Sequence, residues 1–338
     1  MAIRKYRQLP TQKLKGINIA PRPYDVIANP SRCFATLFRD WPWSTWIKPS
    51  VDACKAQGAN YIRFFGGPAS YYATLNFISQ STYLAQWHQL MAYCQSVGIM
   101  VHAIATFPPH LDGMTANSFA ECSTAAALLA ANLAPYPNLM AFEPMQEPFN
   151  GTSLGTTSAG NDSWSTNTMN AVVAAVMSAS RAAAPDVPMA CSVNRGNNTI
   201  AVWTAAEWTT FPAGDYLDAH IYYSASSADV ATLMGQNSGK KLLLGEFGGP
   251  PFVSGAAAMA SQLTACGGIY ARSDCAGGAY WAHARMDSST SNDYGIYDAS
   301  DNTANATIGD VRTAIATAYS GLSGSPIPIR FRRKRRAI

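Results

Sequence analysis

Eight short runs of β-branched and aromatic residues recur along this 338-residue chain, and each is followed by a stretch of helical length. Such alternation is typical of a parallel sheet whose strands are connected by helices. The predicted strands are 15–19, 61–65, 100–106, 139–145, 189–193, 217–222, 242–247 and 279–283. The predicted helices are 49–57, 82–97, 118–134, 167–184, 199–209, 228–237, 255–266 and 308–319.

Eight strand–helix units favour an α/β fold of one domain, a (β/α)8 TIM barrel, which typically takes about 250 residues. The longest connections, 20–47, 107–117, 148–164 and 284–306, all follow strands, and in such barrels these loops form the face that carries the chemistry. An open doubly wound sheet is the alternative, but the first strand lacks the glycine-rich phosphate turn of that fold. We expect a catalytic domain at 15–322, a basic N-terminal extension at 1–14 and a basic, flexible tail at 323–338.

The charges are distributed unevenly. Residues 1–22 and 330–338 each hold six Lys or Arg and no acid, whereas residues 23–329 hold 12 basic and 20 acidic residues. A mildly acidic body argues against nucleic acid as a partner, and a charged fraction of only 13% suits neutral partners. The tail RFRRKRR is expected to be a solvated end, with an anionic partner as the alternative.

Export signals, membrane spans and metal-binding patterns are missing from the sequence. No apolar run approaches the roughly 20 residues of a membrane span, and the first twenty residues lack the apolar core of a secretory signal. We therefore expect a soluble protein, cytoplasmic or released by another route. The seven cysteines show no CxxC spacing, so we expect reduced thiols, no metal and no cofactor. Cys266 and Cys275 are the one pair whose spacing suggests a disulfide.

Three of the five glutamates, Glu143, Glu147 and Glu246, lie within or at the end of strand-like apolar runs. A charge in such a run is costly unless it is paired or used in chemistry. Because strand ends meet at the mouth of a barrel, Glu147 and Glu246 can face each other although they are 99 positions apart. Hydrolysis of a glycosidic bond needs two such carboxyl groups, one to protonate the leaving oxygen and one to attack the anomeric carbon. By alternation along the strand, Glu143 is expected to lie deeper, as a buried structural acid.

Six short motifs follow one another in the order of the predicted strands. They are GINI at 16–19, GANYIR at 58–63, FEPMQEP at 142–148, DAHIY at 218–222, LGEFG at 244–248 and YW at 280–281. Together they resemble the motifs of clan A glycoside hydrolases, nearest to the cellulase-like family 5, whose members are retaining (β/α)8 barrels. The resemblance covers most of the chain, from Gly16 to about Trp281.

The resemblance implies a role for each matching residue. Glu147 would be the acid/base and Glu246 the nucleophile. The fixed charge of Arg63 would keep Glu246 ionised. Tyr222 would hydrogen-bond the same carboxylate, and His220 would tune the acid/base or contact the substrate.

Two further residues are placed at the sugar by the resemblance, and the chain departs from the family pattern at two positions. Trp281 would form the floor of a sugar subsite. Gln146 stands where the family has Asn, and its amide would reach the sugar 2-hydroxyl. The family's third-strand His is also missing, since His102 comes several residues too early. Three tryptophans at 41, 43 and 46 are expected either to form a sugar platform or to pack within their loop.

The sequence thus predicts a retaining β-glycosidase that acts on a neutral oligo- or polysaccharide. Two alternatives remain open. One is a carbohydrate-binding barrel without hydrolysis, in a surface or particle assembly. The other is a transglycosylase that uses the same two glutamates.

Overall fold

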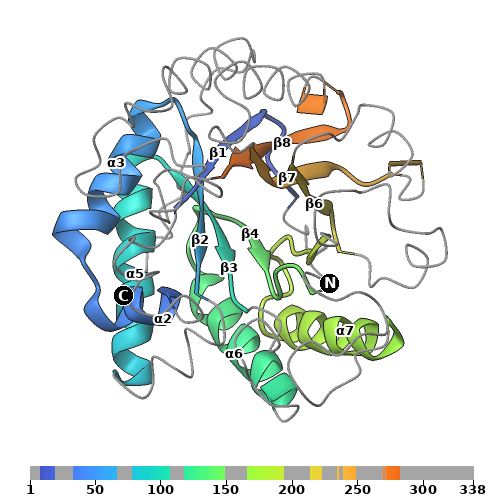
Figure 1. The fold of residues 1–338 in the computed structure, drawn as a ribbon, viewed down its shortest axis with the longest axis horizontal. Helices are drawn as coiled ribbons and strands as arrows, with labels where there is room; N and C mark the ends of the chain where they lie inside the picture. Colours follow the sequence, from blue (N-terminus) through green and yellow to red (C-terminus); the bar gives the residue numbers. More distant parts are fainter. Residues whose placement is uncertain are drawn as a thin grey trace, which may run out of the picture.

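Eight parallel strands form one sheet in the order β4-β3-β2-β1-β8-β7-β6-β5 (Figure 1). The structure, a computed structural model, describes residues 8–19, 33–66, 78–106, 118–148, 166–193, 214–222, 234–235, 239–248, 269–270 and 272–281. The strands are β1 (Leu14–Asn18), β2 (Tyr61–Phe65), β3 (Met100–Ile104), β4 (Leu139–Glu143), β5 (Ser192–Val193), β6 (Leu217–Tyr222), β7 (Leu242–Gly248) and β8 (Cys275–Tyr280).

The two outer strands of this order are β4 and β5, and a parallel bridge joins Phe142 of β4 to Met189, which lies three residues before β5. The Phe142 amide donates to Pro188 O over 2.9 Å at the same place. The ring of strands is therefore closed, and the chain is a (β/α)8 barrel as predicted. Among the described residues, this join has the fewest paired residues of all the strand contacts. It consists of one pair, whereas every other pair of neighbouring strands has two or more.

Helices cover one side of the ring of strands, at the left and bottom of the view in Figure 1. They are α2 (Cys33–Asp40), α3 (Lys48–Ala56), α5 (Gln80–Val97), α6 (Ser118–Leu133) and α7 (Thr166–Ala183), with a π-helix, η2 (Trp43–Ile47), leading into α3. Helix α5 begins where Ser79 Oγ accepts from the Thr82 amide and ends at Gly98, whose φ of 75° is left-handed. Four predicted helices agree with α3, α5, α6 and α7 to within two residues, whereas the other four, apart from residues 234–235, lie outside the described residues.

The eighth strand differs from the prediction. The sequence suggested 279–283, but the strand already includes Gly277 and Gly278, which precede that range. Gly277 has φ 139°, and a Cβ there would lie 2.1 Å from Leu14 O on β1. These two strands therefore approach so closely that only glycine fits, which is why the strand starts earlier than its apolar residues indicate.

Two apolar layers hold the barrel together. The larger one fills the space between strands and helices and includes Trp87, Leu90, Val101 and Phe142. The smaller one fills the inside of the barrel at the amino ends of the strands. Its members are Leu14, Tyr61, Met100, Met140, Ala141, Ala190, Tyr216, Leu243, Ala276 and Ala279. Buried polar side chains occupy the barrel interior next to this apolar layer, toward the carboxyl ends of the strands. We call them the polar layer, and they are Asn18, Arg63, His102, Glu143, Gln146, Glu147, Ser192, Asp218, His220 and Glu246.

The tryptophans of the first long connection pack on the outside of the barrel. Trp41 stacks on Phe38 with ring centroids 5.4 Å apart, and its Nε1 donates to Gln89 Oε1 on α5 over 2.7 Å. Trp43 meets Tyr93 of the same helix edge to face, and Trp46 is buried. The structure thus shows loop packing at these rings, the second of the two roles expected for them.

Lys13, the residue before β1, binds the chain where β8 begins. Its ammonium donates to the carbonyls of Tyr270, Arg272 and Cys275 at 2.6–2.7 Å, ahead of β8 and at its first residue. The thiol of Cys275 is free and buried, so it forms no disulfide, while Cys266 and the tail at 323–338 lie outside the described residues. None of the helices described here has the length and apolarity that a bilayer crossing requires.

Candidate active site

Arg63 lies at the centre of the polar layer and is fully buried on β2. Its Nη1 donates to Glu246 Oε1 over 2.5 Å and to Asn18 Oδ1 over 3.1 Å, and its Nη2 donates to Glu143 Oε2 over 2.5 Å. Burial alone would lower the pKa of Arg63, but the neighbouring carboxylates of Glu143 and Glu246 outweigh it and raise the pKa. The guanidinium is therefore charged and links β1, β4 and β7 across the barrel.

Glu246 on β7 is held from two sides at one oxygen. Besides Arg63, Gln146 donates its Nε2 to Glu246 Oε1 over 2.8 Å. The contact of Gln146 with a sugar hydroxyl stays a prediction, and in this structure its amide donates to the neighbouring carboxylate. Both residues are buried, with exposures of 4% for Gln146 and 3% for Glu246.

Glu147 lies beyond the end of β4, which stops at Glu143. Its φ of 43° is left-handed, a conformation that non-glycine residues seldom adopt and that is often found at functional sites. The Glu147 amide donates to Ser192 Oγ over 2.8 Å, which fixes this turn against β5. Strand alternation therefore does not apply between residues 143 and 147, contrary to the argument from sequence, and the turn directs Glu147 to the site.

His220 on β6 connects the two glutamates. Its Nε2 lies 3.1 Å from Arg63 Nη2, and because a guanidinium nitrogen can only donate, Nε2 must accept. The ring proton therefore resides on Nδ1, which donates to Glu147 Oε1 and lies 3.6 Å from Glu246 Oε2. Burial lowers the pKa of His220 to about 4, against the opposing effect of Glu246, so the ring is neutral at neutral pH.

A shift in strand register places His220 at this position. The pairing of β6 with β7 shifts between Ala219 and His220, and the shift sets His220 opposite Glu246. Gly245 makes room for it, since a Cβ there would lie 2.9 Å from His220 Nε2 and 2.1 Å from Asp218 Oδ1. The glycine just before Glu246 is therefore a steric requirement of the site.

The two glutamates that the sequence singled out come together. One carboxylate oxygen of Glu147, one of Glu246 and a ring nitrogen of His220 all lie within 4.8 Å of one another. Such a trio has the residue types of a metal site, but His220 Nδ1 carries a proton directed at Glu147 and has no lone pair to offer. The arrangement suits proton transfer and nucleophilic attack better than metal binding.

Glu143 is fully buried beneath this pair, and both of its oxygens have partners. Oε2 pairs with Arg63 and Oε1 accepts from the Ser192 amide over 2.9 Å. This is the buried, hydrogen-bonded acid that the sequence predicted.

The aromatic residues expected at the sugar are only partly described. Trp281 follows β8 at its carboxyl end, is partly exposed, and meets Phe65 edge to face at 5.4 Å. Tyr222 ends β6, but its side chain lies outside the described residues. The roles of both residues at the sugar stay predictions.

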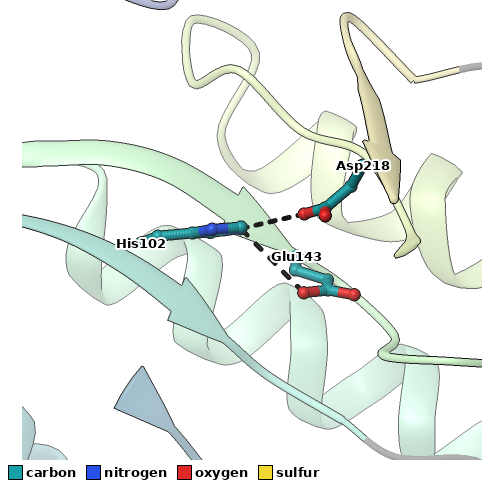
Figure 2. A group of neighbouring side chains, drawn as sticks. All are labelled: His102, Glu143 and Asp218. Atoms are coloured by element: carbon teal, nitrogen blue, oxygen red, sulfur yellow. Dashed lines mark ion pairs between the residues drawn. The ribbon is translucent and has the colours of Figure 1, made fainter. Parts of the chain in front are cut away.

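Several residues of the polar layer had no role in the sequence interpretation. They are Asn18, His102, Ser192 and Asp218, all fully buried. His102 Nε2 lies 3.8 Å from Asp218 Oδ2 and 4.0 Å from Glu143 Oε2, as Figure 2 shows. One sequence feature could have identified all four residues, because each is a polar residue inside or beside an apolar strand run.

Comparisons with known proteins find relatives by structure only. No protein-family model matches the chain, and no curated protein matches it in sequence. A broad-specificity endoglucanase of glycoside hydrolase family 5 from Clostridium longisporum aligns over 93% of this chain and 97% of its own, at 16% identity and TM-score 0.63. The chain has the fold of family 5 glycoside hydrolases.

Two other glycoside hydrolase structures have the same fold. A family 5, subfamily 18 structure from Streptomyces cattleya, in complex with GlcNAc, aligns over 95% of this chain and 83% of its own, at 14% identity and TM-score 0.65. An exo-β-1,4-mannosidase from Opitutaceae bacterium strain TAV5 aligns over 96% of this chain and 63% of its own, at 15% identity and TM-score 0.65. The structural similarity establishes the fold of the chain. Because the sequence identities are this low, the activity has to be inferred from the residues of the site.

Proposed function

We propose that the protein is a retaining β-glycoside hydrolase that cleaves a neutral oligo- or polysaccharide through a covalent glycosyl-enzyme. The observation that carries this proposal is the pair of carboxylate oxygens of Glu147 and Glu246 within 4.8 Å of each other. Retaining glycosidases have carboxyl groups about 5–5.5 Å apart, whereas inverting ones need about 6.5–9.5 Å to hold a water. The spacing here favours direct attack by one carboxylate.

Glu246 is the nucleophile in this mechanism. Arg63 and Gln146 both donate to its Oε1, and hydrogen bonds to the charged form keep a carboxylate ionised. The ionised carboxylate attacks the anomeric carbon, and the bond from that carbon to the leaving oxygen breaks with its electron pair going to the oxygen.

Glu147 supplies the proton that the leaving oxygen takes up. Because His220 Nδ1 donates to Glu147 Oε1, a proton on this carboxyl group resides on the other oxygen, Oε2. After the first step Glu147 is a carboxylate, and the same hydrogen bond stabilises its charge. It then accepts a proton from the water that attacks the anomeric carbon and releases Glu246, and two displacements restore the original configuration.

Two further observations support a neutral sugar as substrate. The body of the chain has few charges, which suits an uncharged ligand, and the family 5 fold is shared with an endoglucanase and a β-mannosidase. Trp281, partly exposed at the carboxyl end of β8, would offer an apolar face to the sugar ring.

The proposal is tested with the purified chain on a panel of aryl β-glucosides, mannosides, xylosides and galactosides. Proton NMR of the first product should show the β-anomer before mutarotation, and an α-anomer would overturn the retaining mechanism. Glu246→Gln should abolish cleavage, while Asp274→Asn, which removes a surface carboxylate paired with Arg272, should leave it unchanged. Binding of oligosaccharides without any cleavage would favour the carbohydrate-binding barrel, and transfer to an added sugar acceptor as the main reaction would favour the transglycosylase.

A further inference from the structure

Beneath the two glutamates lies a second group of ionisable side chains, His102 on β3, Glu143 on β4 and Asp218 on β6. All three are fully buried. Figure 2 shows that the ring of His102 points between the two carboxylates, with Nε2 3.8 Å from Asp218 and 4.0 Å from Glu143. The mechanism proposed above uses neither His102 nor Asp218.

The polar layer contains more acids than bases. Its carboxyl groups are Glu143, Glu147, Asp218 and Glu246, and Arg63 is the one Lys or Arg that contacts them among the residues that the structure describes. Neither histidine adds a positive charge that would balance the acids. His220 is neutral by its contact with Arg63, and burial, reinforced by Arg63 and His220, lowers the pKa of His102 well below its usual range.

Asp218 is the acid that this layer does not stabilise as an anion. Neither of its oxygens has a hydrogen-bond partner of normal geometry, whereas Glu143 and Glu246 both accept from Arg63. Burial and then the charge of Glu143 raise the pKa of Asp218 well above its usual range, and Arg63 and the Gly245 amide offset this only in part. A buried carboxylate with so little hydrogen bonding is the most costly charge in the layer.

We propose that Asp218 is held as a neutral carboxylic acid in the folded protein and acts as a positioning residue, leaving the single charge of Arg63 to Glu143 and Glu246. The protonation itself rests on burial and contacts alone. The consequence for Glu246 as nucleophile rests on the proposed function.

A metal ion at the same place is the competing explanation, since His102, Glu143 and Asp218 bring ligand atoms within 4.8 Å of one another. Three arguments oppose a metal ion here. Both oxygens of Glu143 are engaged by Arg63 and the Ser192 amide, His102 Nε2 lies 3.2 Å from the Tyr216 hydroxyl, and a cation would lie beside the guanidinium.

The direct test is infrared difference spectroscopy in D₂O between the wild type and Asp218→Asn at neutral pH. We expect the carbonyl band of a buried neutral carboxylic acid in the wild type and its loss in the variant. Loss of an ionised-carboxylate band instead would overturn the proposal. If the variant does not fold, ¹³C-aspartate NMR of the wild type gives the same answer, because a protonated aspartate must persist at neutral pH.

Stability against pH gives a second test. Unfolding returns Asp218 to its ordinary acidity, so this carboxyl group holds a proton in the folded state and loses it on unfolding from about pH 4 up to the pKa of Asp218 in the folded protein. Across this window the folding equilibrium constant of the wild type should fall about tenfold per pH unit relative to that of Asp218→Asn. The groups facing Asp218 are common to both proteins and cancel. They are Arg63, His102, Glu143, Cys191, Tyr216, His220 and Glu246.

Glu143→Gln is the matched control, because it makes the same carboxylate-to-amide change in the same layer. Glu143 is paired with Arg63 over 2.5 Å, so its replacement should weaken folding at neutral pH. The gain of Asp218→Asn over the wild type should instead grow as the pH rises. A constant difference between Asp218→Asn and the wild type from pH 4 to 8 would contradict the proposal.

Two more measurements separate this inference from the proposed function. In kcat/KM, Asp218→Asn should leave the acidic limb of the pH profile in place. A shift of that limb to lower pH would mean that Asp218 carries a charge that Glu246 feels. Zn²⁺ or Mn²⁺ that raises the Tm of chelator-treated wild type, but not of Asp218→Asn, would identify a metal site and overturn the proposal. The infrared and stability results hold whether or not the protein cleaves glycosides.

Discussion

Arg63 donates Nη1 to Glu246 Oε1 over 2.5 Å, and the two side chains are 0% and 5% exposed. The other end of the guanidinium holds Glu143 at the same distance. One cation on β2 thus balances one carboxylate on β4 and another on β7. Its loss would leave both of them buried without a counter-charge.

Arg63→Met is therefore expected to destabilise the protein by about 3–5 kcal/mol, the usual cost of removing one partner of a buried ion pair. The free energy of unfolding in urea measures this. Arg272→Met is the control, since Arg272 pairs with Asp274 at the surface and exposed pairs contribute about 0–1 kcal/mol. Equal losses in the two variants would show that the buried pair has no special role.

Glu147→Gln and Glu246→Gln should differ in their dependence on the leaving group. Without a proton donor, aryl glycosides with acidic phenols still leave, so Glu147→Gln should keep activity on these and lose about 10²–10⁴-fold on poor leaving groups. Glu246→Gln should lose activity on both. Added azide should restore turnover in Glu147→Gln only, with a β-glycosyl azide as product. Reversal of this pattern would exchange the two roles.

His220 should make the protein sensitive to acid. Because burial lowers its folded pKa to about 4 from 6.5, the folded state binds fewer protons than the unfolded state between these values. The stability that depends on a neutral His220 is complete above pH 6.5 and is lost as the pH falls to about 4, by about 3 kcal/mol in total. In urea unfolding, the difference in stability between the wild type and His220→Gln should therefore shrink as the pH falls from 6.5 to about 4. Parallel curves would contradict the prediction.

Ser192→Ala should reduce both stability and turnover. Ser192 Oγ accepts from the Glu147 amide, and a buried amide left without a partner costs about 1–3 kcal/mol. Release of the left-handed turn at Glu147 should also lower kcat. Ser50→Ala is the control, because Ser50 is equally buried and donates to Trp46 O in the outer helices. It should lose stability with kcat unchanged, and a matching loss of kcat in both variants would refute a specific role for Ser192.

Sequence alone predicted the strands and helices well where local pattern determines them. Strand β2 and helices α5 and α7 follow from apolar runs and their boundaries. It also indicated Glu147 and Glu246, because a charge in an apolar run is a local signal. It failed at Gly277, where the position of the strand depends on how closely β1 approaches, a contact between residues far apart in the chain.

The partners of each site residue were harder to predict than the residues themselves. The bond from Gln146 to Glu246, a residue 100 positions away, was not foreseen, and its predicted contact with a sugar stays a prediction. Asp218 was part of a recognised motif, but its lack of hydrogen-bond donors depends on Arg63 being engaged elsewhere. Such properties arise from the whole polar layer and have no pattern in the sequence.

The join between β4 and β5 has a consequence for engineering this protein. Beside the single bridge from Phe142 to Met189, the two strands are held by Ser192, whose amide and hydroxyl bind Glu143 and the Glu147 backbone. The groups that shape the chemistry therefore also fasten the wall of the barrel. Substitutions selected for a new substrate near Glu147 will tend to loosen this wall, and a second set of changes that strengthens the join should be introduced first.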